Sequence, residues 1–263
     1  MNPYILVSLV LITFYSYSQI VLDVFDSPSP PRSLIDFEYL ECQQMFDGNS
    51  NSLARGTLFK FNDSVILEKI SESSRKCEDF QRIFQFFLEP KSEEELHFPL
   101  AYGMLIHENF VQLSLLLSAI YQPQNQFCLA IDGKSTQEFI DLVKMLSDCY
   151  PNIHYFVTDE IVWCGYEILT SVFQCVEYLA KLPSDWKYFQ YLSGVDAPLK
   201  SNLEMVRILK ALNGSFNAEI QPFEYYRLRR KMPWNSPLPL FKTSLSATFS
   251  RESANFMISN EVQ

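Results

Sequence analysis

Three polar side chains follow short apolar segments of this sequence, at His107, Asp132 and Asp196. An imidazole can move a proton, and a carboxylate can accept hydrogen bonds from the hydroxyls of a sugar. Each also has an ordinary structural explanation. His107 can be a satisfied structural residue, and Asp196 can cap the segment after it. Asp132 can begin a turn with Gly133, because Asp-Gly pairs favour turns. The residue types alone leave both explanations open.

A cluster of basic and aromatic side chains occupies 225–231, shortly after Glu219. Aromatic faces stack on sugar rings, and Arg side chains such as Arg227 and Arg230 donate hydrogen bonds to hydroxyls or carboxylates. We place Glu219 on a strand ahead of this cluster. The alternative is an exposed basic helical turn that binds nothing.

Alternating strands and helices would position these residues. Apolar periodicity predicts strands at 100–107, 127–131, 153–157 and 188–192, and helices at 109–121, 136–149, 166–182 and 203–212. Such alternation is typical of a mostly parallel sheet flanked by helices, so the predicted fold class is α/β. Ligands bind at the carboxyl ends of the strands in such sheets, where His107, Asp132 and Asp196 are expected.

The overall composition narrows the range of partners. The chain has 263 residues, of which 48% are apolar, and a formal net charge of -10 at pH 7. A buried core is therefore expected. Binding to nucleic acid is not expected, because a phosphate backbone attracts Lys and Arg. The six cysteines form no Cys-x-x-Cys pair, which argues against a zinc ribbon or a thioredoxin-like site.

The N-terminus contains a nearly uncharged apolar run, from Tyr4 to Leu22, that is long enough to cross a bilayer. We interpret it as a signal-anchor with its N-terminus inside. A cleaved signal peptide is the alternative, because Ser16-Tyr17-Ser18 offers small residues at a cleavage-like spacing. Both deliver the remaining chain to an oxidising compartment. The acceptor triplets at Asn62 and Asn213 could then carry glycans.

We divide the chain into four parts. They are a membrane segment at 1–22, a short Pro-rich stem at 23–33, a helical region at 34–97 and an α/β domain at 98–263. The acidic run at 92–95 is expected to be a solvated connector.

Six segments between about Cys77 and Glu261 keep a specific order and spacing. They are 98–102, His107, 117–125, 128–132, 186–188 and 192–204, the last reading LSGVDAPLKSNLE. These segments resemble glycosyltransferase family 14, which contains the core-2/I-branching β-1,6-N-acetylglucosaminyltransferases. The motif at 192–204 is the most specific of the six.

The resemblance implies a GT-A-like fold and an inverting enzyme held in the Golgi membrane as a single-pass type II protein. Such enzymes transfer N-acetylglucosamine from UDP-GlcNAc to a 6-hydroxyl of galactose or N-acetylgalactosamine in a glycan or glycoprotein acceptor. They work without a metal, because basic side chains neutralise the diphosphate. In this sequence the Asp-any-Asp pair that often holds a cation is absent. Asp159 and Glu160 are adjacent on the chain, so on a strand they would point to opposite faces.

The resemblance also assigns roles to individual residues. His107, Asp132 and Trp163 fall on donor-side positions, with Trp163 standing where the family has a Tyr. Glu219, Arg227 and Arg230 fall on the acceptor side, with Arg227 standing where the family has a Lys. Asp196 is a further site candidate. The implied disulfides are Cys77–Cys149 and Cys128–Cys175, Cys42 resembles a cysteine whose partner lies near the family's C-terminus, and Cys164 has no counterpart.

The family's catalytic carboxylate is expected in a segment that would follow Gln263. We therefore expect a chain that lacks the C-terminal part of the domain, as a truncated gene product, a short isoform or an inactive paralogue. A lumenal protein that binds glycans or acts as a scaffold without catalysis is the alternative function.

Overall fold

The computed structural model describes residues 42–58, 62–228, 239–243 and 246–259. They form two compact units, divided between Gln85 and Phe86, and the short segment Ile66–Glu68 groups with the second unit. The predicted membrane segment 1–22 and stem 23–33 lie outside the described residues. Among the residues that are described, no helix has the length and apolar character needed to span a bilayer.

Short helices make up the first unit. They are α2 (Cys42–Phe46), α3 (Ser50–Leu58), α4 (Asp63–Glu72), whose residues 66–68 group with the second unit, and α5 (Lys76–Phe84). Phe80, Ile83 and Phe84 are the buried side chains of α5 and share one face at helical spacing. The rings of Phe80 and Phe84 lie 4.6 Å apart.

A mostly parallel sheet forms the centre of the second unit. Within the described residues its strand order is β3-β2-β1-β4-β7, and only β7 runs antiparallel to its neighbour. The strands are β1 (Leu100–Ile106), β2 (Gln126–Ile131), β3 (Ile153–Val157), β4 (Tyr188–Ser193) and β7 (Thr248–Ser250). The predicted α/β class is confirmed, and the four predicted strands agree with β1 to β4 to within one residue at each end.

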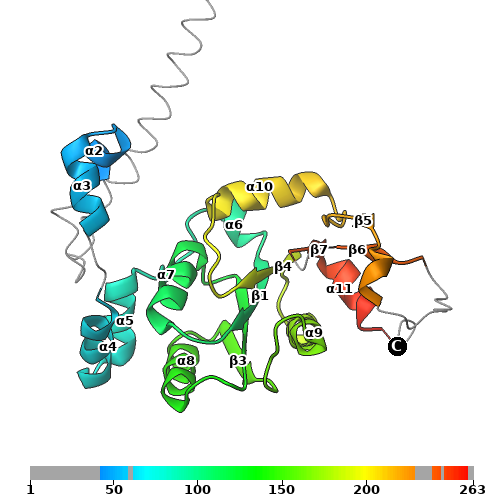
Figure 1. Cartoon of the computed structure of the whole chain (residues 1–263), viewed down its shortest axis with the longest axis horizontal. Helices are drawn as coiled ribbons and strands as arrows, with labels where there is room; N and C mark the ends of the chain where they lie inside the picture. The colour runs from blue at the N-terminus through cyan, green and yellow to red at the C-terminus, as the bar shows by residue number, and fades with distance from the viewer. Residues whose placement is uncertain (1–41, 59–61, 229–238, 244–245, 260–263) are drawn as a thin grey trace, which may run out of the picture. The chain divides into compact units, whose positions relative to one another are not determined.

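Helices cover both faces of this sheet (Figure 1). They are α6 (Glu93–Leu96), α7 (Phe110–Ile120), α8 (Gln137–Cys149), α9 (Tyr166–Lys181), α10 (Asn202–Leu212) and α11 (Arg251–Met257). In Figure 1, α7 and α8 lie on one side of the strands and α9 on the other. Successive side chains of β1 point to opposite faces of the sheet. Ala101 belongs to the core cluster that includes residues of α9 and α11. Tyr102, next to it, stacks on Phe127 with ring centroids 5.2 Å apart.

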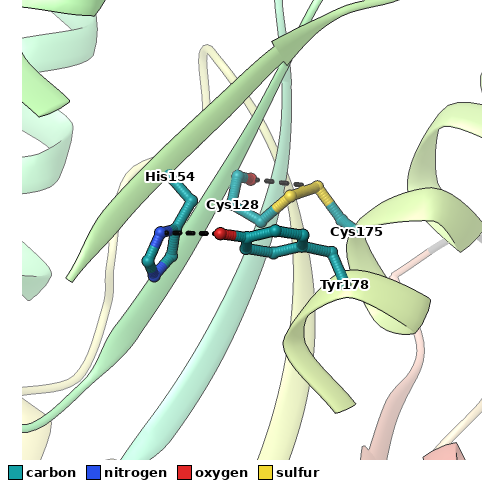
Figure 2. Close-up of a disulfide and its surroundings, with 4 residues drawn as sticks. All are labelled: Cys128, His154, Cys175 and Tyr178. Atoms are coloured by element: carbon teal, nitrogen blue, oxygen red, sulfur yellow. Dashed lines mark hydrogen bonds between the residues drawn. A yellow bond between two sulfur atoms is a disulfide. The ribbon is translucent and has the colours of Figure 1, made fainter. Parts of the chain in front are cut away.

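A disulfide fastens α9 to the sheet, because Cys128 of β2 and Cys175 of α9 are bonded. This is the pairing that the resemblance implies for these two cysteines. Figure 2 shows the bond beside His154 of β3 and Tyr178 of α9, whose hydroxyl lies 3.2 Å from His154 Nδ1. Burial lowers the pKa of His154, which favours its neutral form. Cys77 and Cys149 are also disulfide-bonded, and their pairing with each other remains a prediction.

The acidic run at 92–95 is not the solvated connector that the sequence suggested. Ser92 caps the short helix α6, and Glu95 is only 2% exposed. The Glu95 carboxylate accepts hydrogen bonds from Ser92 Oγ at 2.7 Å and from Asn202 Nδ2 at 2.8 Å. Asn125 donates to Asn202 Oδ1 at 2.9 Å and accepts from the backbone N–H of Leu100 at 2.9 Å. A buried carboxylate needs such partners, and the charge count of the run could not reveal them.

Replacing both Cys128 and Cys175 with Ala should lower the free energy of unfolding by about 4 kcal/mol, because the bridge joins residues 47 apart and restricts the unfolded chain. Urea unfolding of the full chain without reductant measures this change. The matched control is Cys164→Ser, because this thiol is free and exposed. The control should stay within about 0.5 kcal/mol of the wild type. An unchanged urea midpoint in the double variant would contradict the prediction.

Candidate functional site

The carboxyl end of β1 holds the two neighbouring strand ends in place. The backbone N–H of Asp132, after β2, donates to Ile106 O at 2.9 Å, and the N–H of Gly194, after β4, donates to Leu105 O at 3.0 Å. Because β2 and β4 both run parallel to β1, their loops emerge at the same edge of the sheet. The segments carrying Asp132 and Asp196 therefore start on either side of β1.

Asp132 is buried, with 6% of its surface exposed, and it organises the loops around it. Its Oδ1 accepts hydrogen bonds from the backbone N–H groups of Lys134 at 2.9 Å and Ile161 at 3.1 Å. The Lys134 ammonium lies 3.5 Å from Oδ2. The turn interpretation of Asp132 therefore holds, and one carboxylate oxygen remains beside a basic group at the edge of the site.

The pKa of Asp132 is lowered by its surroundings. Burial opposes ionisation, but the hydrogen bonds from Lys134 and Ile161 outweigh it, together with the nearby charges of Lys134 and His107. The carboxylate is therefore ionised at neutral pH and gives this edge of the sheet a fixed negative charge.

Gly133 is where the loop after β2 touches the loop after β3. A Cβ atom at Gly133 would lie 2.6 Å from the carbonyl oxygen of Thr158, which is backbone and cannot turn aside. The Gly133 N–H donates to Asp159 O at 3.3 Å. The absence of a side chain thus allows the two loops to pack closely and places Ile161 within reach of Asp132.

His107 lies beside Ser135, a residue that the sequence analysis did not single out. Ser135 Oγ donates to the carbonyl oxygen of His107 at 2.7 Å, and its distance to His107 Nδ1 is 3.3 Å. Ser135 comes three residues after Asp132, so its place on the same loop was the only signal in the sequence. The exposed imidazole of His107 and the half-buried hydroxyl of Ser135 thus lie next to the Asp132 turn.

Trp163 is almost fully exposed, at 90%, two residues beyond the anchored Ile161. A turn closed by the Gly165 N–H and Val162 O at 2.7 Å holds this segment ahead of α9. Cys164, within the turn, has a left-handed φ of 62° and a free, exposed thiol. A large flat ring held in solvent near the strand ends is suited to stacking on a planar or sugar ring.

Asp196 stabilises its own loop. Its Oδ2 accepts from the Ser193 N–H at 2.6 Å, and its N–H donates to Ser193 O at 3.4 Å. The residue is exposed. This bond runs back to Ser193, so Asp196 does not cap the segment that follows it, and the cap of the next helix, α10, is Ser201.

The acceptor-side candidates lie in a later part of the chain. Glu219 is exposed and accepts a hydrogen bond from Gln221. It precedes the strand β5 (Gln221–Pro222) and does not lie on it, so the prediction that Glu219 is on a strand was wrong. β5 pairs with β6 (Phe241–Lys242). The backbone of Arg227 belongs to the 3₁₀ turn η2 (Tyr225–Leu228), and Arg230 lies outside the described residues. Within the described part of the chain, no hydrogen bond or ion pair joins Glu219 to His107, Asp132 or Asp196.

No group of three or more His, Cys, Asp or Glu side chains is arranged to hold a metal ion among the described residues. Both candidate glycan acceptors are exposed, Asn62 ahead of α4 and Asn213 at the end of α10.

The second unit is an α/β domain whose mostly parallel sheet carries an imidazole, a carboxylate, a hydroxyl and an exposed indole near its carboxyl edge, where ligands bind in domains of this class. The family described as Core-2/I-Branching enzyme matches residues 100–263, so the chain belongs to that family.

Individual relatives agree with this assignment. A human beta-1,3-galactosyl-O-glycosyl-glycoprotein beta-1,6-N-acetylglucosaminyltransferase 3 is 39% identical over 154 residues, covering 57% of this chain and 35% of the relative. A second human protein, named beta-1,3-galactosyl-O-glycosyl-glycoprotein beta-1,6-N-acetylglucosaminyltransferase, is 28% identical over 249 residues, covering 84% of this chain and 58% of the relative. The chain thus spans between about a third and three-fifths of the length of these two relatives.

Among solved structures, a mannosyltransferase from Pyrobaculum calidifontis superposes with a TM-score of 0.36 and 10% identity, covering 74% of this chain and 58% of that chain.

Asp132→Asn should lower the free energy of unfolding by about 1–2 kcal/mol at pH 7, because a neutral amide accepts the two loop N–H groups more weakly than a carboxylate does. The pKa of Asp132 is lowered in the fold, so its stabilising contribution is complete above the ordinary Asp value and is lost as pH falls through the lowered one. The difference between the wild type and the variant should therefore shrink between roughly pH 5 and pH 2.

Urea unfolding at a series of pH values measures this difference. Asp159→Asn is the matched control, since Asp159 is exposed on the facing loop and should change stability by less than about 0.5 kcal/mol. A gap between the wild type and Asp132→Asn that does not depend on pH would contradict the assigned role of the charge.

Proposed function

We propose that this chain is an inverting glycosyltransferase of the β-1,6-N-acetylglucosaminyltransferase type. It moves N-acetylglucosamine from UDP-GlcNAc to a 6-hydroxyl of galactose or N-acetylgalactosamine in a glycan, within a GT-A-like fold and without a metal. The observation that carries the proposal is the family match over 100–263, which includes every strand end at which the polar groups gather. The names of both human relatives describe a β-1,6-N-acetylglucosaminyltransferase.

The donor would bind at the carboxyl edge of β1 and β2. The exposed indole of Trp163 would stack on the uracil base or the ribose, because flat apolar rings associate face to face in water. His107 and Ser135 would supply hydrogen bonds to hydroxyls or phosphate oxygens. Asp132 would act mainly by holding the loops of Lys134 and Ile161 in place, and the Lys134 ammonium would lie near the negative diphosphate.

The acceptor glycan would lie on the side of the later segment, at Glu219, Arg227 and Arg230. The bridge between Asn217 and Thr248 makes this segment antiparallel to β7, and β7 is antiparallel to β4. The segment at Asn217 is therefore parallel to β4, and after Asn217 it continues toward the same end of the sheet at which β4 ends, before Asp196. That course supports a place for Glu219 near the same end of the sheet.

We also propose that the protein is held in the Golgi membrane by the apolar run at 4–22, with the α/β domain in the lumen. Two disulfide-bonded cysteines in the core and two exposed glycosylation triplets support an oxidising, lumenal setting.

The function is tested by offering the purified full chain UDP-GlcNAc and a β-1,3-galactosyl O-glycan, and measuring release of UDP and growth of the glycan. Transfer to the 6-hydroxyl is the expected result. If the folded protein binds the glycan and neither binds UDP nor releases it, the chain is a glycan-binding member of the family without catalysis, and the transferase proposal is wrong.

Trp163→Ala should weaken UDP binding about tenfold, since loss of a stacked ring removes roughly 1–3 kcal/mol per base. Calorimetric titration of the full chain with UDP measures the affinity. Tyr166→Ala is the matched control, because this aromatic side chain is also exposed, at 73%, three residues further along. Equal UDP affinity in the wild type and Trp163→Ala would remove the stacking role.

Asn62→Gln and Asn213→Gln should each remove one glycan from the protein made in animal cells, because both triplets are exposed and would face the lumen. Mobility on a gel, with and without an endoglycosidase, counts the glycans. Migration of the wild type that is unaffected by the endoglycosidase would contradict the lumenal orientation.

A further inference from the structure

An apolar pocket lies on the α7 side of the sheet, beneath the loop that follows β4. Its volume is about 260 Å³. Apolar side chains of α7 and α10 line it, including Leu116, Ile120 and Met205, and Ala197 of the loop forms part of its wall. An engineered apolar cavity of about 150 Å³ is large enough to bind benzene, so this pocket can hold a substituted six-membered ring.

Two polar side chains on neighbouring strands lie side by side at this pocket. Tyr102 of β1 and Gln190 of β4 are register partners, and both line the pocket. Among the described residues, the buried Oε1 of Gln190 has no hydrogen-bond partner. Burial raises the pKa of Tyr102, so its hydroxyl stays protonated and able to donate. An acceptor without a partner in a buried place is costly, and a ligand that donates to it would remove that cost.

These features define the ligand. The pocket wall requires a flat or compact apolar body, and Gln190 Oε1 requires a donor at one end. A hydroxyl meets the second need and can also accept from Tyr102, whereas a carboxylate offers no donor to Gln190. The charged residues at the pocket, Asp196 and Lys200, are exposed and belong to the loop rather than to the strands.

We propose that this pocket is a binding site for a small neutral phenol, whose ring packs under the 196–200 loop and whose hydroxyl donates to Gln190. The site goes beyond the proposed transferase function, because its lining includes none of His107, Asp132 and Trp163. An occupant would support the loop that carries Asp196 from below.

Phenol and toluene are the probes, matched in size and differing in the hydroxyl. Methyl NMR of the full chain, with free ligand set by dialysis, should show saturable shifts at Leu116, Ile120 and Met205, with a dissociation constant for phenol of about 1 mM. Ala197→Leu should weaken phenol binding at least tenfold by filling the pocket. Ala211→Leu, a matched change at an exposed position of α10, should leave phenol binding unchanged.

Gln190→Leu provides a second test that does not depend on filling the pocket. The ratio of phenol affinity to toluene affinity should fall about fivefold, the worth of one ordinary hydrogen bond. Absence of saturable shifts at these methyl groups, or an affinity ratio that Gln190→Leu leaves unchanged, would overturn the proposal.

Discussion

The hydrogen bonds at the end of β1 are the constraint on which the rest of the site depends. The carbonyl oxygen of Leu105 accepts a hydrogen bond from the segment that leads to Asp196. The carbonyl oxygen of Ile106 accepts one from Asp132 itself. The central strand thereby fixes two loops at once, although they are far apart in the chain. Asp132 extends the same order to a third loop through the N–H of Ile161. The positions of all three loops therefore depend, directly or through Asp132, on the end of β1.

The fold could be predicted well from the sequence where physical signals are local. Runs such as 153–157 and 166–182 carry their own periodicity, and α10 has a capping box between Ser201 and Glu204 that marks its beginning. Glu95 shows the limit of such signals. It stands in an acidic run with Glu93 and Glu94, and its partner Asn202 lies 107 positions away. Only the folded chain shows that this carboxylate is buried.

The candidate site divides in the same way. The position of His107, Asp132 and Asp196 at one edge of the sheet could be predicted, because each follows a predicted strand and the strands were expected to be parallel. Their bonding could not be read in advance, because Asp132 and Asp196 direct an oxygen at backbone N–H groups whose positions depend on turns. Ser135 was missed because an isolated Ser carries no distinctive pattern. Glu219 was placed on a strand, whereas pairing begins at Gln221.

The polar contacts of Glu95 bear on how the α/β domain could be excised. A fragment cut at residue 98 would contain all of β1 and every candidate ligand contact, yet Asn202 would lose its carboxylate partner at the start of α10. Asn202 is at the end of the loop that begins at Gly194 after β4. Loss of the Glu95 contact would therefore also disturb this loop, which starts at the carboxyl edge of the sheet. A minimal fragment should begin at or before Phe86, because the second compact unit consists of Phe86–Gln263 together with the short segment Ile66–Glu68.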